Sequence, residues 1–282
     1  MKPSFIPLAT SQSGSCLTMA NWQELGIQTL AYSLHSLLMK PGYSLLNSLP
    51  NLQSYCGWPG SIVLTATLAA ANTLGIYTFR SLYDGSLISI SQEELFSLII
   101  KLQPDLVILP AGFRAYLVEQ QLSLPSSIKL FVPVDESLEA ENTANLGVNL
   151  VYEMNYSFSD LLSQVKQYKA RPLYLSGAFN YSEAQELIEH GADWLESDKP
   201  ASDAFHGQVY GDKDSFSLLN KEMTNQHVPI SSNCGCPTCR QKLTRAYLHH
   251  LITHTPLLCQ RFLIHHNVHY YNHRIETSSL VL

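Results

Sequence analysis

Short apolar runs alternate along the chain with longer amphipathic segments. Each run is rich in aliphatic and β-branched side chains and ends in polar residues. This pattern is typical of a strand that is buried on both faces of a parallel sheet. Strands are therefore predicted at residues 5–9, 29–34, 61–66, 105–111, 128–134, 148–154, 171–177 and 192–198.

The segments between these runs carry apolar residues at helical spacing, most clearly at 92–102, 157–168 and 182–190. We expect Ser182 to open the third helix and Gly191 to end it. Strands that alternate with helices in this way predict an α/β fold, a (β/α)8 TIM-type barrel. A doubly wound open sheet is the main alternative.

Two segments interrupt the alternation. Residues 77–90 contain Asp84-Gly85-Ser86 between β-prone flanks, which predicts a hairpin inserted after the third strand. Residues 199–232 are polar and predict an irregular connection, and residues 242–262 predict a helix that bends near Pro256. We therefore expect a barrel over residues 1–198, with a connection and a smaller subdomain over 199–282 packed on it.

The smaller subdomain begins with a cysteine cluster, Cys234, Cys236 and Cys239, in the spacing C-x-C-x2-C. Three thiolates and one imidazole complete a tetrahedral shell for a structural Zn²⁺ ion, and adjacent histidines follow at His265 and His266. A closed shell leaves no open position for catalysis, so the metal indicates architecture. The alternative is a set of free buried thiols.

The composition is that of a globular chain, with 45% hydrophobic and 14% charged residues. No apolar run is long enough to span a membrane, and the first residues lack the features of a secretory signal. Six cysteines, half of them in the cluster, indicate a reducing compartment, and we expect a cytoplasmic protein. Cys16, Cys56 and Cys259 are expected to be small buried hydrophobes.

The charge is unevenly distributed. The net charge is −6, which is unusual for a nucleic-acid-binding protein, yet five basic residues and one acid follow position 232. A basic segment on an acidic body is compatible with a surface that faces a polyanion and equally with a solvated helix face. Both interpretations remain open at this point.

Several motifs together resemble the tRNA-guanine transglycosylase family. Residues 245–251 (RAYLHHL) match a family helix, and 266–271 (HNVHYY) are similar to its HNLRYY. Residues 40–42 (KPG), 79–86 (FRSLYDGS) and 171–177 (RPLYLSG) resemble further family segments. The resemblance implies a β/α barrel with a C-terminal zinc subdomain, dimerisation, and exchange of guanine in tRNA for a 7-deazaguanine base. It also implies that His266 is the fourth zinc ligand, with His265 as its competitor.

The expected reaction needs a carboxylate nucleophile and a proton-transfer group at the carboxyl ends of barrel strands. By the resemblance, the aspartate of the family's LTDSGGFQ strand is replaced by Ala66, and its base-recognising aspartate by Ala111. The nucleophile position carries Glu196 instead of aspartate. The extra methylene displaces the carboxylate, and a misplacement of about 1 Å can cost roughly a hundredfold in rate.

The remaining candidates are acidic. Glu196 and Asp135 are the candidate catalytic residues, and Glu136, Glu153 and Asp198 follow other strands nearby. Several carboxylates in one cleft could raise one another's pKa or hold a cation. Alternatively, a pocket that is no longer used has drifted, and these acids are solvated on loops.

The expected function is that of a tRNA-guanine transglycosylase-like protein without ordinary base exchange. It would bind tRNA or another RNA, as a homodimer or as a non-catalytic partner of a catalytic paralogue, with no membrane association. The alternative is an active or repurposed transglycosylase or nucleosidase that uses Glu196 as its nucleophile. A protein-interaction scaffold unrelated to RNA is the third possibility.

Overall fold

The structure is a computed structural model that describes residues 3–137, 146–153, 157–212 and 214–278. Every strand predicted for the barrel is present, although residue 154, the expected end of one of them, lies outside the described residues. The strands are β1 (Ser4–Ile6), β2 (Thr29–Ser33), β3 (Ser61–Thr65), β6 (Leu106–Ile108), β7 (Lys129–Pro133), β8 (Leu146–Tyr152), β9 (Leu173–Gly177) and β10 (Trp194–Glu196).

These strands form one parallel sheet in the order β1-β10-β9-β8-β7-β6-β3-β2. The sheet closes because the chain just after β1 pairs with β2. The Ala31 amide donates to the Pro7 carbonyl at 3.0 Å, and the Ala9 amide donates to the Ala31 carbonyl at 2.9 Å. Each strand therefore lies beside its neighbour in sequence, which confirms the (β/α)8 barrel and excludes the open sheet.

Side chains fill the barrel interior. Phe131, Tyr174 and Trp194 form its aromatic part, with ring centroids of Phe131 and Trp194 5.2 Å apart. Gly147 lies under this layer, where a Cβ atom would stand 2.2 Å from the Phe131 ring. The barrel interior is thus a packed core, and a binding site formed by the strands must lie at the barrel mouth.

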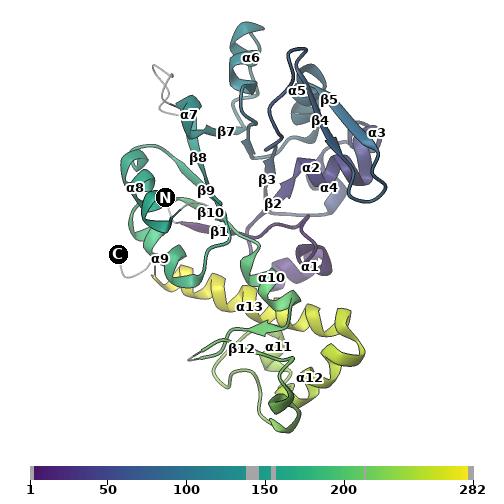
Figure 1. The fold of residues 1–282 in the computed structure, drawn as a ribbon, viewed down its shortest axis with the longest axis vertical. Coiled ribbons are helices and arrows are strands. Elements are labelled where there is room, and N and C mark those ends of the chain that lie inside the picture. The colour runs from purple at the N-terminus through teal and green to yellow at the C-terminus, as the bar shows by residue number, and fades with distance from the viewer. Residues whose placement is uncertain (1–2, 138–145, 154–156, 213, 279–282) are drawn as a thin grey trace.

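Short helices cover the barrel, and the hairpin β4 (Ile76–Arg80) with β5 (Leu87–Ser91) projects from it as predicted (Figure 1). The third predicted helix starts at Tyr181, not Ser182, because the Asn180 side chain caps it and Glu183 completes a capping box. Gly191, with φ of +113°, ends that turn. The helices of the barrel are α1 (Met19–Glu24), α2 (Leu34–Leu37), α3 (Tyr43–Ser48), α4 (Leu52–Cys56), α5 (Gln92–Leu102), α6 (Phe113–Glu119), α7 (Val134–Ser137), α8 (Phe158–Tyr168) and α9 (Tyr181–Glu189).

The segment after β10 differs from the predicted irregular connection. It opens with α10 (Lys199–Phe205), which buries Ala201 and Ala204 against α13 (Pro256–Ser278). Two short strands follow, β11 (Gln208–Val209) and β12 (Phe216–Ser217). Small buried residues gave α10 no strong apolar periodicity, which explains the wrong prediction.

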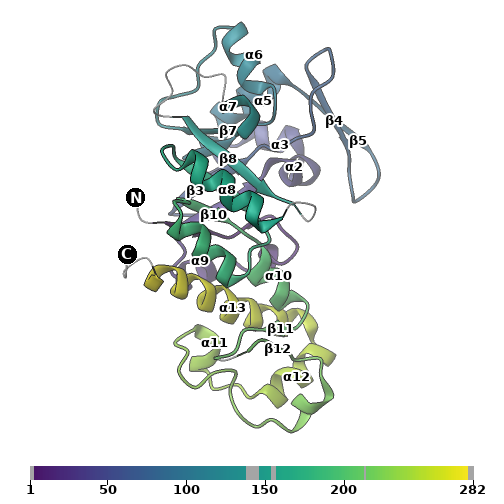
Figure 2. The same ribbon diagram turned by 60° about the vertical axis from the view of Figure 1, so that its left-hand side comes forward.

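The helix predicted over 242–262 is divided at Thr255 into α12 (Arg245–His254) and α13, close to Pro256 as expected. Helix α13 lies along one side of the barrel, and α11 (Pro237–Arg240) and α12 lie on its far side (Figures 1 and 2). Among the described residues, no helix combines the length and the apolar character needed to cross a membrane.

Candidate functional site

The three cysteines of the C-x-C-x2-C segment converge on one imidazole nitrogen. His266 Nδ1 lies 3.7 Å from Cys234 Sγ, 3.5 Å from Cys236 Sγ and 3.3 Å from Cys239 Sγ. In a tetrahedral site with Zn–S of about 2.3 Å and Zn–N of about 2.0 Å, the S···N edges are about 3.5 Å. The donor set and its spacing therefore fit a tetrahedral metal ion.

His266 is held in the orientation that a metal ligand needs. Its other ring nitrogen, Nε2, lies 2.6 Å from the Tyr210 carbonyl oxygen, so Nε2 carries the proton and Nδ1 is free to bind. Burial opposes protonation of the ring, but the hydrogen bonds to Cys234, Cys236 and the Tyr210 carbonyl outweigh it and raise the pKa of His266 to about 9. A metal ion would take the place of that second proton.

Local structure brings the sulfurs together. Cys236 caps α11, and its Sγ accepts a hydrogen bond from the Cys239 amide at 3.2 Å. Pro237 occupies the first turn of α11, where its missing N–H costs nothing. His265, the competing ligand, is buried elsewhere on α13, because successive residues of a helix point about 100° apart.

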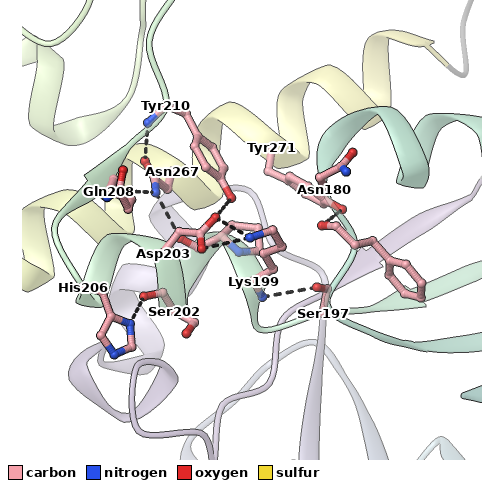
Figure 3. Close-up of polar contacts among 12 residues, drawn as sticks. Asn180, Ser197, Lys199, Ser202, Asp203, His206, Gln208, Tyr210, Asn267 and Tyr271 are labelled. Atoms are coloured by element: carbon pink, nitrogen blue, oxygen red, sulfur yellow. Dashed lines mark hydrogen bonds and ion pairs between the residues drawn. The ribbon is translucent and has the colours of Figure 1, made fainter. Parts of the chain in front are cut away.

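Asn267, the residue after His266, joins α13 to the segment after β10 (Figure 3). Its Oδ1 accepts from the Tyr210 amide, and its Nδ2 donates to the carbonyls of Pro200 and Gln208. The Tyr210 hydroxyl donates in turn to Asp203 at 2.7 Å. A single buried amide thus satisfies three backbone groups from the segment after β10 and ties that segment to α13.

At the mouth of the barrel, the carboxyl ends of β3, β6, β7 and β8 surround a cavity of about 460 Å³. Ala111, Asp135 and Glu153 line it, and all three are exposed. Asn149 also lines it, with only 3% of its surface exposed, and its Oδ1 accepts no hydrogen bond from any described group. Ala66 is fully buried beneath this mouth.

Glu196 lies inside the barrel at the end of β10 and is 8% exposed. Its Oε2 accepts from the Tyr174 hydroxyl at 2.6 Å and from the Thr65 hydroxyl at 2.9 Å. Burial raises the pKa of Glu196, and the two hydrogen bonds oppose that rise. Glu196 is also one of the residues that line a second cavity of about 360 Å³ at the ends of β9 and β10.

Asp198 borders the second cavity too, where it accepts from Ser11 Oγ at 2.6 Å and Ser13 Oγ at 2.7 Å. Burial raises its pKa despite these bonds. Glu136 instead accepts from the Gly112 amide. The five candidate acids are thus divided between the two cavities and the turn at Gly112. Asp135 and Glu196, the two candidate catalytic residues, line different cavities.

The basic residues of the C-terminal segment are largely used within the protein. Arg245 donates to the carbonyls of Pro229 and Ile230 and packs over the Phe216 ring. Arg274 lies over the Tyr270 ring, and Arg240 pairs with Glu24 at 3.2 Å. Most of the charge that marked this segment as basic is therefore committed to internal contacts.

Several site residues were not predicted. Tyr174 and Thr65 donate hydrogen bonds to Glu196, and Asn149 contributes the unpaired oxygen of the first cavity. Inward alternation along β8 and β9 could have pointed to Asn149 and Tyr174 as interior polar residues. Asn267 stood inside a matched motif, but only the fold reveals its three partners.

Comparisons with known proteins agree with both the barrel and the Cys₃His cluster. A family model described as queuine tRNA-ribosyltransferase matches residues 1–121 and 136–278. The queuine tRNA-ribosyltransferase of Methylacidiphilum infernorum is 24% identical over 323 aligned positions, covering 96% of this chain and 85% of the relative. That of Thermodesulfovibrio yellowstonii is 22% identical, covering 95% of this chain and 82% of the relative.

A higher identity is confined to a shorter segment. The queuine tRNA-ribosyltransferase of Lachnoclostridium phytofermentans is 34% identical over 108 residues, which span 38% of this chain and 28% of the relative. The family match nevertheless covers the Cys₃His cluster and every barrel strand except β7. The closed barrel, the Cys₃His cluster beside α13 and a match over nearly the whole length agree: the chain belongs to the queuine tRNA-ribosyltransferase family.

Proposed function

We propose that this protein binds tRNA, or another RNA, in 7-deazaguanine (queuosine-type) modification without ordinary base exchange. It acts as a non-catalytic subunit, in a homodimer or beside a catalytic paralogue. Membership of the family and the names of the full-length relatives support the RNA. Free cysteines throughout the described residues support a reducing compartment, and the cytoplasm is the location we propose.

The observation that carries the proposal is the state of the reactive positions. Ala66 and Ala111 have no group that can transfer a proton or recognise a base by a carboxylate. Glu196 keeps a carboxyl group, but Tyr174 and Thr65 occupy its Oε2 inside the barrel. Attack on a sugar carbon needs an ionised and accessible carboxylate, and burial disfavours the ionised form.

We further propose that the Cys₃His centre holds a structural Zn²⁺ ion, and that the boundary between barrel and zinc subdomain lies at 198/199. Four protein donors close the shell, so the ion stabilises the fold and does not activate water. Chelation should lower the melting temperature, and Co²⁺ substitution should give the absorption of a thiolate-rich tetrahedral site. Retention of the metal by His266→Ala with unchanged affinity would contradict the ligand set.

The function is tested with purified protein, tRNA and radiolabelled guanine. We expect tRNA binding at low salt that weakens as salt rises, and no incorporation of guanine. Because Glu196 borders the second cavity, an active enzyme that uses Glu196 remains the competing function. Incorporation that Glu196→Ala abolishes would establish that alternative, and absence of both tRNA binding and a paralogue partner would refute the proposal.

A further inference from the structure

A hollow of about 250 Å³ lies between α1 of the barrel and the zinc side of α13, apart from both cavities of the barrel mouth. Figure 1 shows α1 beside α13 at this point. Part of its wall is apolar, formed by Pro237, Leu258 and Phe262. The remaining lining is polar and includes Arg261 and His265, neither of which the metal centre uses.

His265 is the most informative part of this lining. It is 5% exposed, and its Nε2 has no hydrogen-bond partner among the described residues. Buried ring nitrogens are ordinarily paired, since leaving one unpaired forfeits its hydration. An unpaired nitrogen that borders a hollow is therefore a position where a ligand atom can complete the bond.

Arg261 lies one helical turn before His265, so the two side chains share one face of α13. The guanidinium group is exposed and makes no ion pair with any described acid. The acid in the lining, Glu24, pairs at 3.2 Å with Arg240, which lies outside the lining. Arg261 is therefore the charged group of the lining that has no ion-pair partner among the described residues.

Asn21 supplies a further donor. Its Oδ1 accepts from the Thr18 amide and hydroxyl, so Nδ2 is the Asn21 group available to a ligand in the hollow that Asn21 lines. Gln241 also lines the hollow, but its Nε2 donates to the Pro237 carbonyl. A guanidinium fork, an imidazole nitrogen and an amide N–H together form a set of donors with one positive charge.

We infer that this hollow binds a phosphate group. A planar guanidinium pairs with two phosphate oxygens at once, and the neutral donors of His265 and Asn21 can bind the others. The hollow has room for the group to which the phosphate is attached. The phosphate belongs either to an RNA backbone or to a small phosphorylated compound, and the inference stands whether or not the chain exchanges bases.

The test uses the full chain in its metal-bound form. Inorganic phosphate is titrated calorimetrically against wild type, Arg261→Gln and Lys242→Gln, a control that removes a cation of the same segment outside the hollow. We expect Arg261→Gln to weaken phosphate binding about tenfold or more, the usual effect of losing a charged hydrogen bond, and Lys242→Gln to leave it unchanged. No phosphate binding at about 1 mM, or equal loss in both variants, would overturn the inference.

A second arm identifies the source of the phosphate. For an RNA backbone, Arg261→Gln reduces the slope of log affinity for tRNA against log salt by about one, while Lys242→Gln does not. If the phosphate belongs to a small compound, Arg261→Gln weakens the binding of inorganic phosphate but leaves the slope of log affinity for tRNA against log salt unchanged. His265→Leu tests whether His265 has only a structural role. We expect this variant to lose phosphate binding. Its stability should equal or exceed that of wild type, because the substitution removes an unpaired buried nitrogen.

Discussion

Glu196 and His266 are both buried ionisable residues, and their surroundings set them to opposite states. His266 Nε2 is fixed by the Tyr210 carbonyl, which frees Nδ1 to bind a metal. Glu196 receives two hydroxyl donors on one oxygen, yet burial still raises its pKa. The surroundings of His266 thus leave one ring nitrogen available to a metal ion, whereas those of Glu196 disfavour the ionised carboxylate that a reaction would need.

Glu196→Gln should stabilise the protein at neutral pH. A carboxyl group whose pKa is raised on folding gives stability that is complete below its ordinary value of 4.5 and is lost as pH rises through the folded pKa. Glutamine cannot ionise and escapes that loss, while its amide oxygen can still accept from Tyr174 and Thr65. We expect a gain on the order of 1 kcal/mol at pH 7 in urea unfolding.

The gain should shrink as pH falls and vanish below about 4.5, since both side chains are then neutral in the folded and unfolded states. Glu119→Gln is the control, because Glu119 is exposed near the end of α6. A Glu196→Gln variant less stable than wild type at pH 7 would show that the ionised carboxylate is favoured in the fold.

For single residues, the sequence predicts which residues form a site better than it predicts their protonation and hydrogen bonding. The Cys₃His set followed from spacing and from a matched motif, because metal ligands are constrained in type and order. The hydrogen bond between Thr65 and Glu196 joins residues 131 positions apart, and no local pattern encodes it. The position of Glu196 was therefore predictable, and its sequestration by Tyr174 was not.

Among the elements, α13 is the helix that places three successive residues against three different parts of the protein. His265 faces the phosphate hollow, His266 the cysteines, and Asn267 the segment after β10. Apolar periodicity predicted the barrel helices because each has one core face. Apolar periodicity says little about α13, because its central turns are buried on several faces. The same criterion failed to predict α10, whose buried residues include two alanines.

Asn267→Leu should destabilise the protein strongly, whereas Asn149→Leu should not. Asn267 makes hydrogen bonds to three backbone groups, and an apolar replacement removes all three bonds in a buried junction. We expect a loss of about 3 kcal/mol or more in urea unfolding.

Asn149 is the matched control, a second buried asparagine whose Oδ1 has no described partner. Leucine has a similar volume and removes an unpaired polar group, so stability should stay level or rise by about 1 kcal/mol. Equal losses in the two variants would mean that the Asn149 oxygen is paired in solution, for example with an ordered water.

At the scale of the whole molecule, the parts that build the fold match the family, whereas we propose that the positions that would carry out the reaction have diverged from it. Strand order and barrel closure follow from the alternation of strands and helices. The sequence pattern alone also allows an open sheet, which the two hydrogen bonds between Ala31 and the chain after β1 exclude. The division of the acids between two cavities depends on strand tilt and packing, which the sequence pattern does not contain.

If Ala66 and Ala111 stand where the family has carboxylates, as the resemblance implies, placing aspartate there should still not restore base exchange, because Ala66 is packed inside the barrel. Ala66 is fully buried, and its amide donates to the Ile108 carbonyl within the sheet. Ala66→Asp would bury a carboxylate without a charged partner, and we expect a loss of about 3 kcal/mol or more. The same change at Ala111, which is exposed, should cost less than about 0.5 kcal/mol. Urea unfolding and guanine incorporation measured on both variants decide the matter: a stable Ala66→Asp variant that exchanges guanine would show that the barrel has kept an active geometry and lost only a side chain.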